Sequence, residues 1–423
     1  MRLFLHLTLG SILILLFIQC QPDRVIITPG TSIVPITPAD PDTTNNNLQN
    51  SGDTIHISTD IIADETWLSN NTYILDTMIT VTNNAKLTIE SCVVVKAAYG
   101  ATGLIIDQGA DIDAQGTASC PIIFTSVNDS LIPGDIVSPN LTGADHGLWG
   151  GIFILGEAPV STMSSPSILQ YLLGGYTYGG QSTSDNSGIF TYVSIRHTGF
   201  ETAPYETPCG LLLAGVGSAS MIDHVELYAN SDDGFVILGG TVNINHVVTS
   251  HFNDDGFDCD KGYAGTMDNL IGIGGNGRDA SLELDGGEGA TNPSFTIRNA
   301  SFKGSQDGEY YVDFQKNVNC LIENSYFFGF DEASEVILER DIDADNWLAG
   351  DIDVLNLEFN TSHLTSGNTT IGTIFVDRGL NGNDAFTLRL PSASIVTSPS
   401  VGANKADFAG WTVADLSGAL TDF

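Results

Sequence analysis

Two pairs of adjacent aspartates occur in nearly identical surroundings along the chain. The segments Ile222–Phe235 and Ile244–Phe257 share Ile, His, Val and a closing Asp-Asp-Gly-Phe at a constant offset of 22 residues. A repeated unit of this length is typical of coils that stack, because one coil cannot bury its apolar face alone. Neighbouring strands in such a stack lie about 4.8 Å apart. The repeat therefore predicts four carboxylates side by side: Asp232, Asp233, Asp254 and Asp255.

Four neighbouring carboxylates must be relieved of their mutual repulsion. Two unit charges about 5 Å apart near a protein surface repel by about 3 kcal/mol. Protonation, hydrogen bonds from backbone N–H groups, or a bound cation would each relieve this repulsion. Calcium fits such a cluster best, since it takes roughly 6–8 oxygen ligands in flexible geometry. The sequence therefore predicts a calcium site at this corner, and Asp258 and Asp260 would extend it.

The same residue types are also common in turns. Asp and Asn satisfy nearby backbone N–H groups with their own side chains, and an Asp-Gly step is a turn signature. A row of aspartates that serves only the backbone is therefore the alternative to calcium binding. His224 and His246 occupy equivalent positions of the two repeats. We interpret them as a structural ladder, in preference to metal ligands or catalysts.

Strands that alternate in polarity must position this acidic corner. Alternate residues of a strand point to opposite faces. In two consecutive coils the expected inward residues are Phe257, Cys259, Leu282 and Leu284, and the expected outward residues are Asp258, Asp260, Glu283 and Asp285. This alternation predicts a stripe of carboxylates along one outer face. The acidic marker of the repeat recurs at Asp279, which we expect level with Asp255.

The overall composition favours strands and an acidic surface. Val, Ile, Thr, Phe and Tyr recur in short runs separated by Gly, Asn and Asp, which is typical of strands and turns. Fourteen Lys and Arg stand against 51 Asp and Glu, a net charge of −37. Such a surface repels phosphate backbones, so we expect no nucleic-acid partner. It is suited either to binding cations or simply to remaining solvated in salty surroundings.

The first residues are typical of an export signal. Residues 1–20 contain Arg2, a long apolar run and Cys20, and the chain then turns abruptly polar. A Cys directly after the apolar segment resembles the acylated residue of bacterial lipoproteins, whose lipid anchors the mature chain in a membrane. Cleavage at another bond and an uncleaved anchor are the alternatives. The Pro-, Thr- and Asn-rich residues 21–52 are interpreted as a tether. Together these features predict an exported, lipid-anchored protein of the outer membrane or cell surface.

Residues 53–423 are expected to form one repetitive body. We expect an N-terminal cap at 53–85, regular coils at 86–345, and last coils with a C-terminal cap at 346–423. Two long excursions, 126–146 and 156–188, interrupt the coils, and binding surfaces are often built on such loops.

Two further groups of side chains bear on this body. The second excursion carries Tyr171, Tyr176 and Tyr178, which would bind sugar rings or pack the loop down. A Cys92–Cys120 bridge between neighbouring coils is possible in an exported protein, although spacing alone does not establish its geometry. Of the other three cysteines, Cys259 and Cys320 lie among apolar strand residues and are expected to be buried.

Several segments together resemble a known group of proteins. These are Leu87-Thr88-Ile89, Gly116-Thr117-Ala118 with the run from Pro121 to Ser126, Trp149-Gly150-Gly151-Ile152, and the two Asp-Asp-Gly-Phe units. Over residues 60–420 the chain resembles secreted or surface β-helix lipoproteins of the Bacteroidetes type. The resemblance implies an all-β fold, a single right-handed parallel β-helix of the pectate-lyase type, usually without an assigned activity.

Three functions are compatible with these features. The preferred hypothesis is a surface lipoprotein that binds carbohydrate or another cell-surface polymer, with calcium at the acidic corner. The second is a calcium-dependent polysaccharide lyase, or a glycoside hydrolase, acting on acidic glycans. A lyase needs a base, and Lys261 and Arg278 are the basic residues near the corner. The third is a structural spacer of the envelope. We prefer binding to catalysis, and Lys261 and Arg278 remain candidate bases for the alternative.

Overall fold

The computed structural model describes residues 52–423, except 165, 170–173, 202–207, 276–278, 306–309, 366, 381 and 383. The predicted signal peptide, Cys20 and nearly all of the tether therefore lie outside the described residues. In the part of the chain that is described, no helix is long and apolar enough to cross a membrane.

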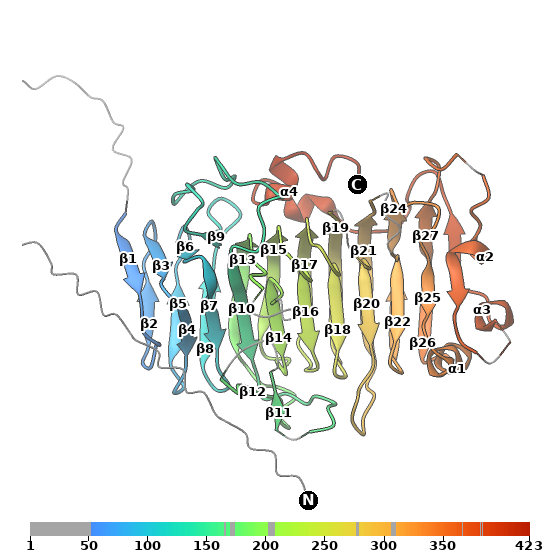
Figure 1. The fold of residues 1–423 in the computed structure, drawn as a ribbon, viewed down its shortest axis with the longest axis horizontal. Helices are drawn as coiled ribbons and strands as arrows, with labels where there is room; N and C mark the ends of the chain where they lie inside the picture. The colour runs from blue at the N-terminus through green and yellow to red at the C-terminus, as the bar shows by residue number, and fades with distance from the viewer. Residues whose placement is uncertain are drawn as a thin grey trace, which may run out of the picture. The chain divides into compact units, whose positions relative to one another are not determined.

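Two parallel sheets wind together through the body, as Figure 1 shows. One sheet, here called sheet B, faces the viewer in Figure 1 and has one strand per coil. Its strands in spatial order are β4 (Met78–Val81), β7 (Gly100–Ile106), β10 (Trp149–Leu155), β14 (Leu211–Ala214), β16 (Phe235–Leu238), β18 (Phe257–Asp260), β20 (Leu282–Asp285), β22 (Val312–Gln315), β25 (Val336–Leu338) and β28 (Phe375–Asp377).

The second sheet, sheet A, supplies the other two sides of each coil. Its strands are β1 (Thr54–Ile57), β2 (Glu65–Trp67), β3 (Thr72–Leu75), β5 (Lys86–Ile89), β6 (Val94–Ala97), β8 (Asp111–Gln115), β9 (Ile122–Ser126), β13 (Gly188–Arg196), β15 (Met221–Tyr228), β17 (Ile244–Ser250), β19 (Thr266–Ile273), β21 (Phe295–Lys303), β23 (Cys320–Glu323), β24 (Tyr326–Phe328), β26 (Ile352–Leu355), β27 (Leu357–Asn360) and β29 (Ala393–Ile395). Each coil therefore runs along two sides of sheet A and one strand of sheet B. These features confirm the predicted parallel β-helix.

Sheet A bends where one residue of each coil adopts positive φ. In consecutive coils these residues are Tyr192, His224, His246, Asn269, Asn299, Asn324 and Asn356, with φ between 48° and 59°. The strand pairing places them in register, since the residues on either side of them are direct partners. We call this row the corner ladder. Non-glycine residues at positive φ are uncommon, and Asn and His are the types enriched there.

The interior is one continuous apolar column. Phe235 and Phe257 belong to it, pair in register and have ring centroids 6.1 Å apart. Cys259 is also in the column, while Asp258 and Asp260 alternate with these residues along β18. The predicted alternation is confirmed, because both neighbouring coils present the same face to the core.

Short strands and helices lie outside the two sheets of the stack. The antiparallel pair β11 (Ser167–Ile168) and β12 (Thr177–Tyr178) lies in the excursion 156–188. Short helices occur only near the C-terminal end of the described chain: α1 (Asp341–Ala349), α2 (Ile371–Ile374), α3 (Ala385–Leu388), the 3-10 helix η1 (Lys405–Phe408) and α4 (Val413–Leu416). The sequence assigned 346–423 to last coils and a cap. Strands β26 to β29 form coils, whereas Phe408 and Trp411 pack on the side of sheet A, against Val248 and Ile271.

The cysteines divide as the sequence suggested. Cys92 and Cys120 form a disulfide between neighbouring coils, with Cα atoms 4.8 Å apart. Cys209, Cys259 and Cys320 are free and buried. Burial raises the pKa of the Cys259 thiol well above its ordinary value, so this thiol is poorly suited to reaction.

Candidate cation site and adjoining cleft

The paired aspartates meet at the turn that leads from sheet A into sheet B. Carboxylate oxygens of Asp232, Asp233 and Asp254 lie within 4.8 Å of one another. A second group, Asp254, Asp255 and Asp279, meets the same limit and shares Asp254 with the first. We call these five residues the acidic corner. The predicted crowding of the four repeated aspartates is therefore present, and Asp254 is its centre.

Part of the acidic corner serves the backbone. Asp233 Oδ1 accepts a hydrogen bond from the Asp255 N–H at 2.9 Å, and Asp255 Oδ1 accepts one from the Ala280 N–H at 2.7 Å. The second aspartate of each pair thus links its coil to the next, as the turn interpretation anticipated. One carboxylate oxygen per pair is committed to this structural role.

The third coil enters the corner with a different register from the one expected. Phe257 pairs with Leu282, and the Asp279 N–H donates to the Asp254 carbonyl. Asp279 is therefore level with Asp254, whereas the sequence pattern placed it level with Asp255. The position level with Asp255 is Ala280, so the backbone-serving row ends there.

Burial and mutual repulsion raise the pKa values of the corner carboxyls and so favour their protonated, uncharged form. Burial, followed by the charge of Asp254, raises the pKa of Asp232 to about 7. Burial and neighbouring carboxylates raise the pKa values of Asp233 and Asp255 well above the ordinary value, and that of Asp254 in the same direction. The bare corner must therefore keep protons near neutral pH, unless a cation replaces them. A set of carboxylate oxygens fits Ca²⁺, a hard cation.

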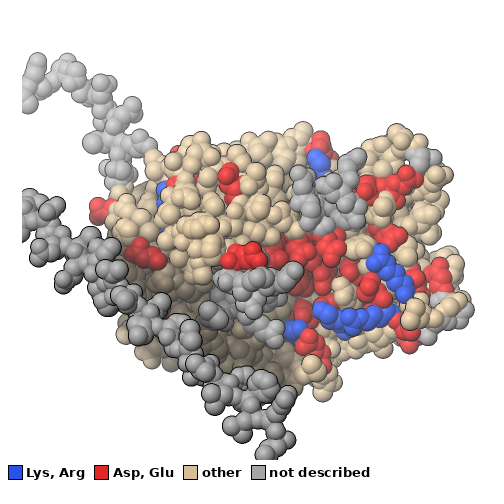
Figure 2. Space-filling model, viewed as in Figure 1, with Lys and Arg blue, Asp and Glu red and all other residues tan. Residues whose placement is uncertain are grey.

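Asp258 and Asp260 lie outside the two groups of close carboxylates. Asp258 is on the outer face of sheet B, where it pairs in register with Val236 and Glu283. Asp260 Oδ2 accepts a hydrogen bond from Lys261 Nζ at 2.6 Å. These residues belong to the predicted outer stripe, which Figure 2 shows as a band of acidic side chains across this face. They neighbour the acidic corner without completing its ligand groups.

The outer stripe is itself strained electrostatically. Glu283 pairs in register with Asp258 of the preceding coil and with Asp313 of the following coil. Three consecutive coils therefore each place one carboxylate in the same row. Burial, followed by the charge of Glu283, raises the pKa of Asp313 to about 8. Asp313 therefore resists ionisation near neutral pH.

Of the two basic residues considered for catalysis, Lys261 is paired with two carboxylates. Lys261 Nζ lies 2.6 Å from Asp260 Oδ2 and 2.6 Å from Glu288 Oε1. Burial opposes its charge, but the hydrogen bonds to these two carboxylates prevail and raise the pKa of Lys261 above its ordinary value. An ammonium held in this way is a poor general base near neutral pH. Arg278 lies outside the described residues.

A cleft of about 720 Å³ opens directly beside the acidic corner. Its walls include Asp232 and Asp254 together with Tyr99, His146 and Phe200. The Tyr99 side chain is 64% exposed, and its ring meets the Phe200 ring edge to face at 5.2 Å. The cleft thus combines an accessible aromatic face with carboxylates, which is a common arrangement for binding polar ring compounds.

His146 fastens the excursion 126–146 to two consecutive coils. Its Nδ1 lies 3.1 Å from Ser231 Oγ, and its Nε2 accepts a hydrogen bond from Asn253 Nδ2 at 3.1 Å. Ser231 and Asn253 immediately precede the aspartate pairs, at equivalent positions of the two repeats. A second hollow of about 470 Å³ is lined by His146, Asn253, Gly275 and other residues, so it adjoins the first. The hollow beside the acidic corner therefore extends across several coils.

The tyrosines of the other excursion do not line this cleft. Tyr178 is buried in an apolar cluster on the outside of sheet B, and burial raises its pKa to about 12. Tyr176 is half-buried beside the same cluster, and its hydroxyl lies 3.0 Å from Thr80 Oγ1. Both rings pack the loop down, which was the alternative to sugar binding. Tyr171 lies outside the described residues.

The aromatic and histidine side of the cleft was not predicted from the sequence. Tyr99, His146 and Phe200 come from three separate segments, and none of them belongs to the repeat. The only signal was the length of the excursion 126–146, which indicated a binding surface without saying which residues would form it.

A stack of parallel coils with an acidic cleft on its side defines the class of this protein, a parallel β-helix protein. The chain belongs to the family described as pectate-lyase like beta helix domain, whose model matches residues 59–413. At the level of the family, this supports a carbohydrate-related role. Comparison with curated proteins and with solved structures gave no match.

Proposed function

We propose that this protein binds carbohydrate at the cell surface, in the cleft beside the acidic corner, with calcium as a bridge. The observation that carries the proposal is the convergence of the exposed Tyr99 ring and the Asp232 and Asp254 carboxylates on one cleft. Membership of a pectate-lyase like family supports a carbohydrate ligand in preference to other polymers.

Calcium would be held by Asp232, Asp233 and Asp254, whose oxygens already lie within 4.8 Å of one another. A bound Ca²⁺ would neutralise the corner and supply open coordination positions to carboxylates of an acidic glycan. Asp233 and Asp255 keep the corner in place through their bonds to the backbone. Tyr99 would stack on a sugar ring, and His146 would hold the loop that closes one wall.

Binding is favoured over the alternative lyase by the state of Lys261. A lyase base must lose its proton near neutral pH, whereas Lys261 is paired with two carboxylates that keep it charged. Incubation with acidic polysaccharides distinguishes the two functions, because elimination creates unsaturated ends that absorb ultraviolet light. Retention of polymer without such ends supports binding.

The test of the binding proposal is retention of acidic glycans with calcium and with a chelator. We expect Asp254→Asn to weaken calcium-dependent retention at least 10-fold, because Asp254 belongs to both groups of close carboxylates. Tyr99→Ala should weaken glycan binding about 5- to 10-fold, the loss of roughly 1–1.5 kcal/mol of ring contact. Calcium affinity should be unchanged in that variant.

The matched control is Asp345→Asn, which removes an exposed carboxylate on α1. It should leave both affinities unchanged. Equal retention by the native protein and Asp254→Asn, or no retention of any acidic glycan, would count against the proposal. Calcium and glycan titrations by calorimetry provide the measurements.

Anchoring by a lipid on Cys20 is part of the same proposal. A lipidated N-terminus followed by a Pro-rich tether would hold the β-helix at a membrane surface while leaving the cleft accessible. Metabolic labelling with a fatty acid should mark the native protein and fail to mark Cys20→Ser. Equal labelling of both proteins would contradict the assignment of Cys20.

A further inference from the structure

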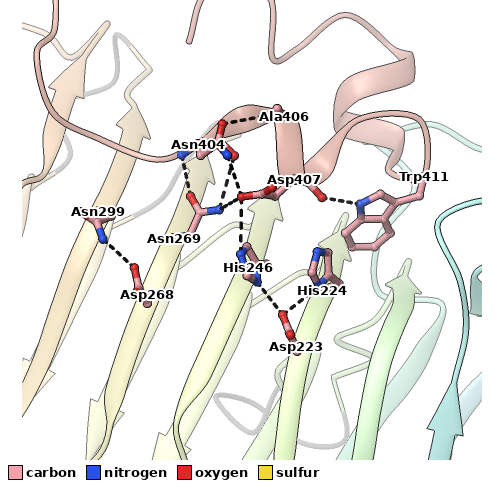
Figure 3. Close-up of polar contacts among 10 residues, drawn as sticks. All are labelled: Asp223, His224, His246, Asp268, Asn269, Asn299, Asn404, Ala406, Asp407 and Trp411. Carbon is pink, nitrogen blue, oxygen red and sulfur yellow. Dashed lines mark hydrogen bonds and ion pairs between the residues drawn. The ribbon is translucent and has the colours of Figure 1, made fainter.

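Aromatic and histidine rings stack along one stretch of the corner ladder, within the strands β13, β15 and β17 that precede the turns of the acidic corner. Tyr192 stacks on His224 at 4.2 Å between ring centroids, and His224 stacks on His246 at 4.3 Å. Trp411, from the C-terminal end of the chain, meets the Tyr192 ring edge to face at 5.4 Å. Figure 3 shows His224, His246 and Trp411 together with the polar groups around them. The ladder is therefore covered by the chain's last residues.

Asp223 joins the two histidines. Its Oδ1 lies 2.8 Å from His224 Nδ1 and 2.6 Å from His246 Nδ1. The two rings stack 23° from parallel, and both Nδ1 atoms face the same carboxylate oxygen of Asp223. The distances are those of charge-assisted hydrogen bonds. This group is arranged to share protons.

His246 also reaches the C-terminal segment, here residues 404–423. Its Nε2 lies 3.5 Å from Asp407 Oδ2. The same Asp407 oxygen accepts hydrogen bonds from Asn269 Nδ2 at 2.9 Å and Asn404 Nδ2 at 3.0 Å. His246 therefore connects a carboxylate of β15 to a carboxylate of η1, and Asp407 is the contact point of the segment.

The surroundings of His246 are predominantly negative. Asp268 of β19 adds to the attraction of a positive charge at His246, and its own partner is Arg298 Nε at 2.8 Å. Lys405 of η1 donates instead to carbonyls of the C-terminal segment itself. The charged and titratable groups around the imidazole, element by element, are Asp223 and His224 of β15, Asp268 of β19, Arg298 of β21, and Asp407 and Lys405 of η1.

We propose that protonated His246 holds the C-terminal segment against the side of the β-helix, and that loss of this proton weakens the contact. With His246 charged, both ring nitrogens donate, one toward Asp223 and one toward Asp407. With His246 neutral, its Nδ1–H still serves Asp223, and the Nε2 lone pair faces the Asp407 carboxylate. The second state loses the attraction between strand and segment, and the segment opens more often.

The direction of the pH effect follows from the same contacts. The hydrogen bond to Asp223 is the main reason that the pKa of His246 is raised above its ordinary value of 6.5. A raised pKa in the folded state means that this contribution to stability is complete below pH 6.5 and is lost as the pH rises through the folded-state pKa. Asp407 raises the same pKa, and its contribution is lost when the segment opens while the Asp223 contact stays, so the segment is held more tightly under acidic conditions.

Hydrogen exchange of the full-length protein tests the proposal. In peptides covering residues 404–411, protection corrected for intrinsic exchange should fall about 5-fold between pH 5.5 and pH 8, as expected for loss of a partly exposed ion pair worth about 1 kcal/mol. A peptide covering β5 serves as the internal reference, so a global change in stability is separated from local opening. The fall should be absent in His246→Gln, whose amide keeps a donor without a titrating charge.

Two further variants keep the test decisive. Asp407→Asn removes the carboxylate on the segment and should also abolish the pH response. His56→Gln is the matched control, because His56 is an exposed histidine paired with Asp76 at 2.8 Å in the first coils. It should respond to pH like the native protein. The proposal is overturned if protection of residues 404–411 responds to pH equally in the native protein, His246→Gln and Asp407→Asn. It is also overturned if protection in the native protein does not respond to pH.

Discussion

In the absence of calcium, the free energy of unfolding should fall as the pH rises from about 4 to about 8. The carboxyls of the acidic corner have folded-state pKa values above the ordinary 3.8, that of Asp232 being about 7. Between these values the folded protein holds more protons than the unfolded chain, so raising the pH favours unfolding. For Asp232 alone the shift corresponds to about 4 kcal/mol, which solvent screening reduces because the group is only partly buried.

Calcium should remove most of this pH dependence. A cation at the corner stabilises the ionised carboxylates, and a ligand at about 100 times its dissociation constant adds about 2.7 kcal/mol to stability. The added stability should be large at pH 8 and small at pH 5, where protons already occupy the corner. Urea denaturation between pH 4 and pH 8, with calcium and with a chelator, measures both effects.

Variants at the corner give this prediction its control. Asp254→Asn should make the calcium-free protein more stable than the native protein at pH 8, because it removes one of the repelling charges, and should flatten the pH dependence. Asp345→Asn, on the exposed side of α1, should behave like the native protein. If the calcium-free protein gained stability up to pH 8, the aspartates would be serving only as backbone acceptors.

Most of the fold could be predicted from the sequence, because its determinants are local and repeated. The period of 22 residues and the apolar positions flanking Asp258 fixed the direction in which side chains point. The register of Asp279 could not be obtained in this way, since the turn before β20 differs in length from the preceding one and only the pairing of Phe257 with Leu282 reveals it. A pattern with a changing period predicts that coils stack without specifying which residues are level.

The candidate site was predictable only where it belongs to the repeat. The carboxylates of the acidic corner recur along the sequence, so stacking alone brings them together. Tyr99 and Phe200 meet across an irregular loop region, and no spacing in the sequence relates them. The same is true of the C-terminal segment, where Trp411 was expected in a cap and instead covers the corner ladder on the side. Contacts between non-repeated segments depend on tertiary packing that local patterns do not encode.

Replacing Glu226 by Ala should cost about 3–5 kcal/mol of stability, the usual effect of removing one partner of a buried ion pair. Glu226 and Arg196 are both completely buried, with Oε2 and a guanidinium nitrogen 3.5 Å apart. Burial opposes both charges, raising the pKa of Glu226 and lowering that of Arg196, while their mutual attraction opposes these shifts. In Glu226→Ala, the guanidinium would remain in the interior without this opposite charge.

Loss of the Glu226 carboxylate should also destabilise two segments that pack on the outside of sheet A. Glu226 Oε1 accepts a hydrogen bond from the Ala414 N–H at 3.0 Å, and Arg196 donates to the Ile136 carbonyl at 2.6 Å. The ion pair therefore connects sheet A to the C-terminal segment and to the excursion 126–146, which carries His146. We expect faster hydrogen exchange in both segments, including the part of the excursion that carries His146.

A double variant without either charge separates the effect of the unpaired charge from the other consequences of losing Glu226. Arg196→Met with Glu226→Leu replaces both charges by apolar groups of similar size, and such replacements are often neutral or stabilising. Urea denaturation should therefore find the double variant several kcal/mol more stable than Glu226→Ala. A double variant as unstable as Glu226→Ala would mean that loss of the hydrogen bond to Ala414, which both variants share, sets the cost, because no unpaired charge remains buried in the double variant.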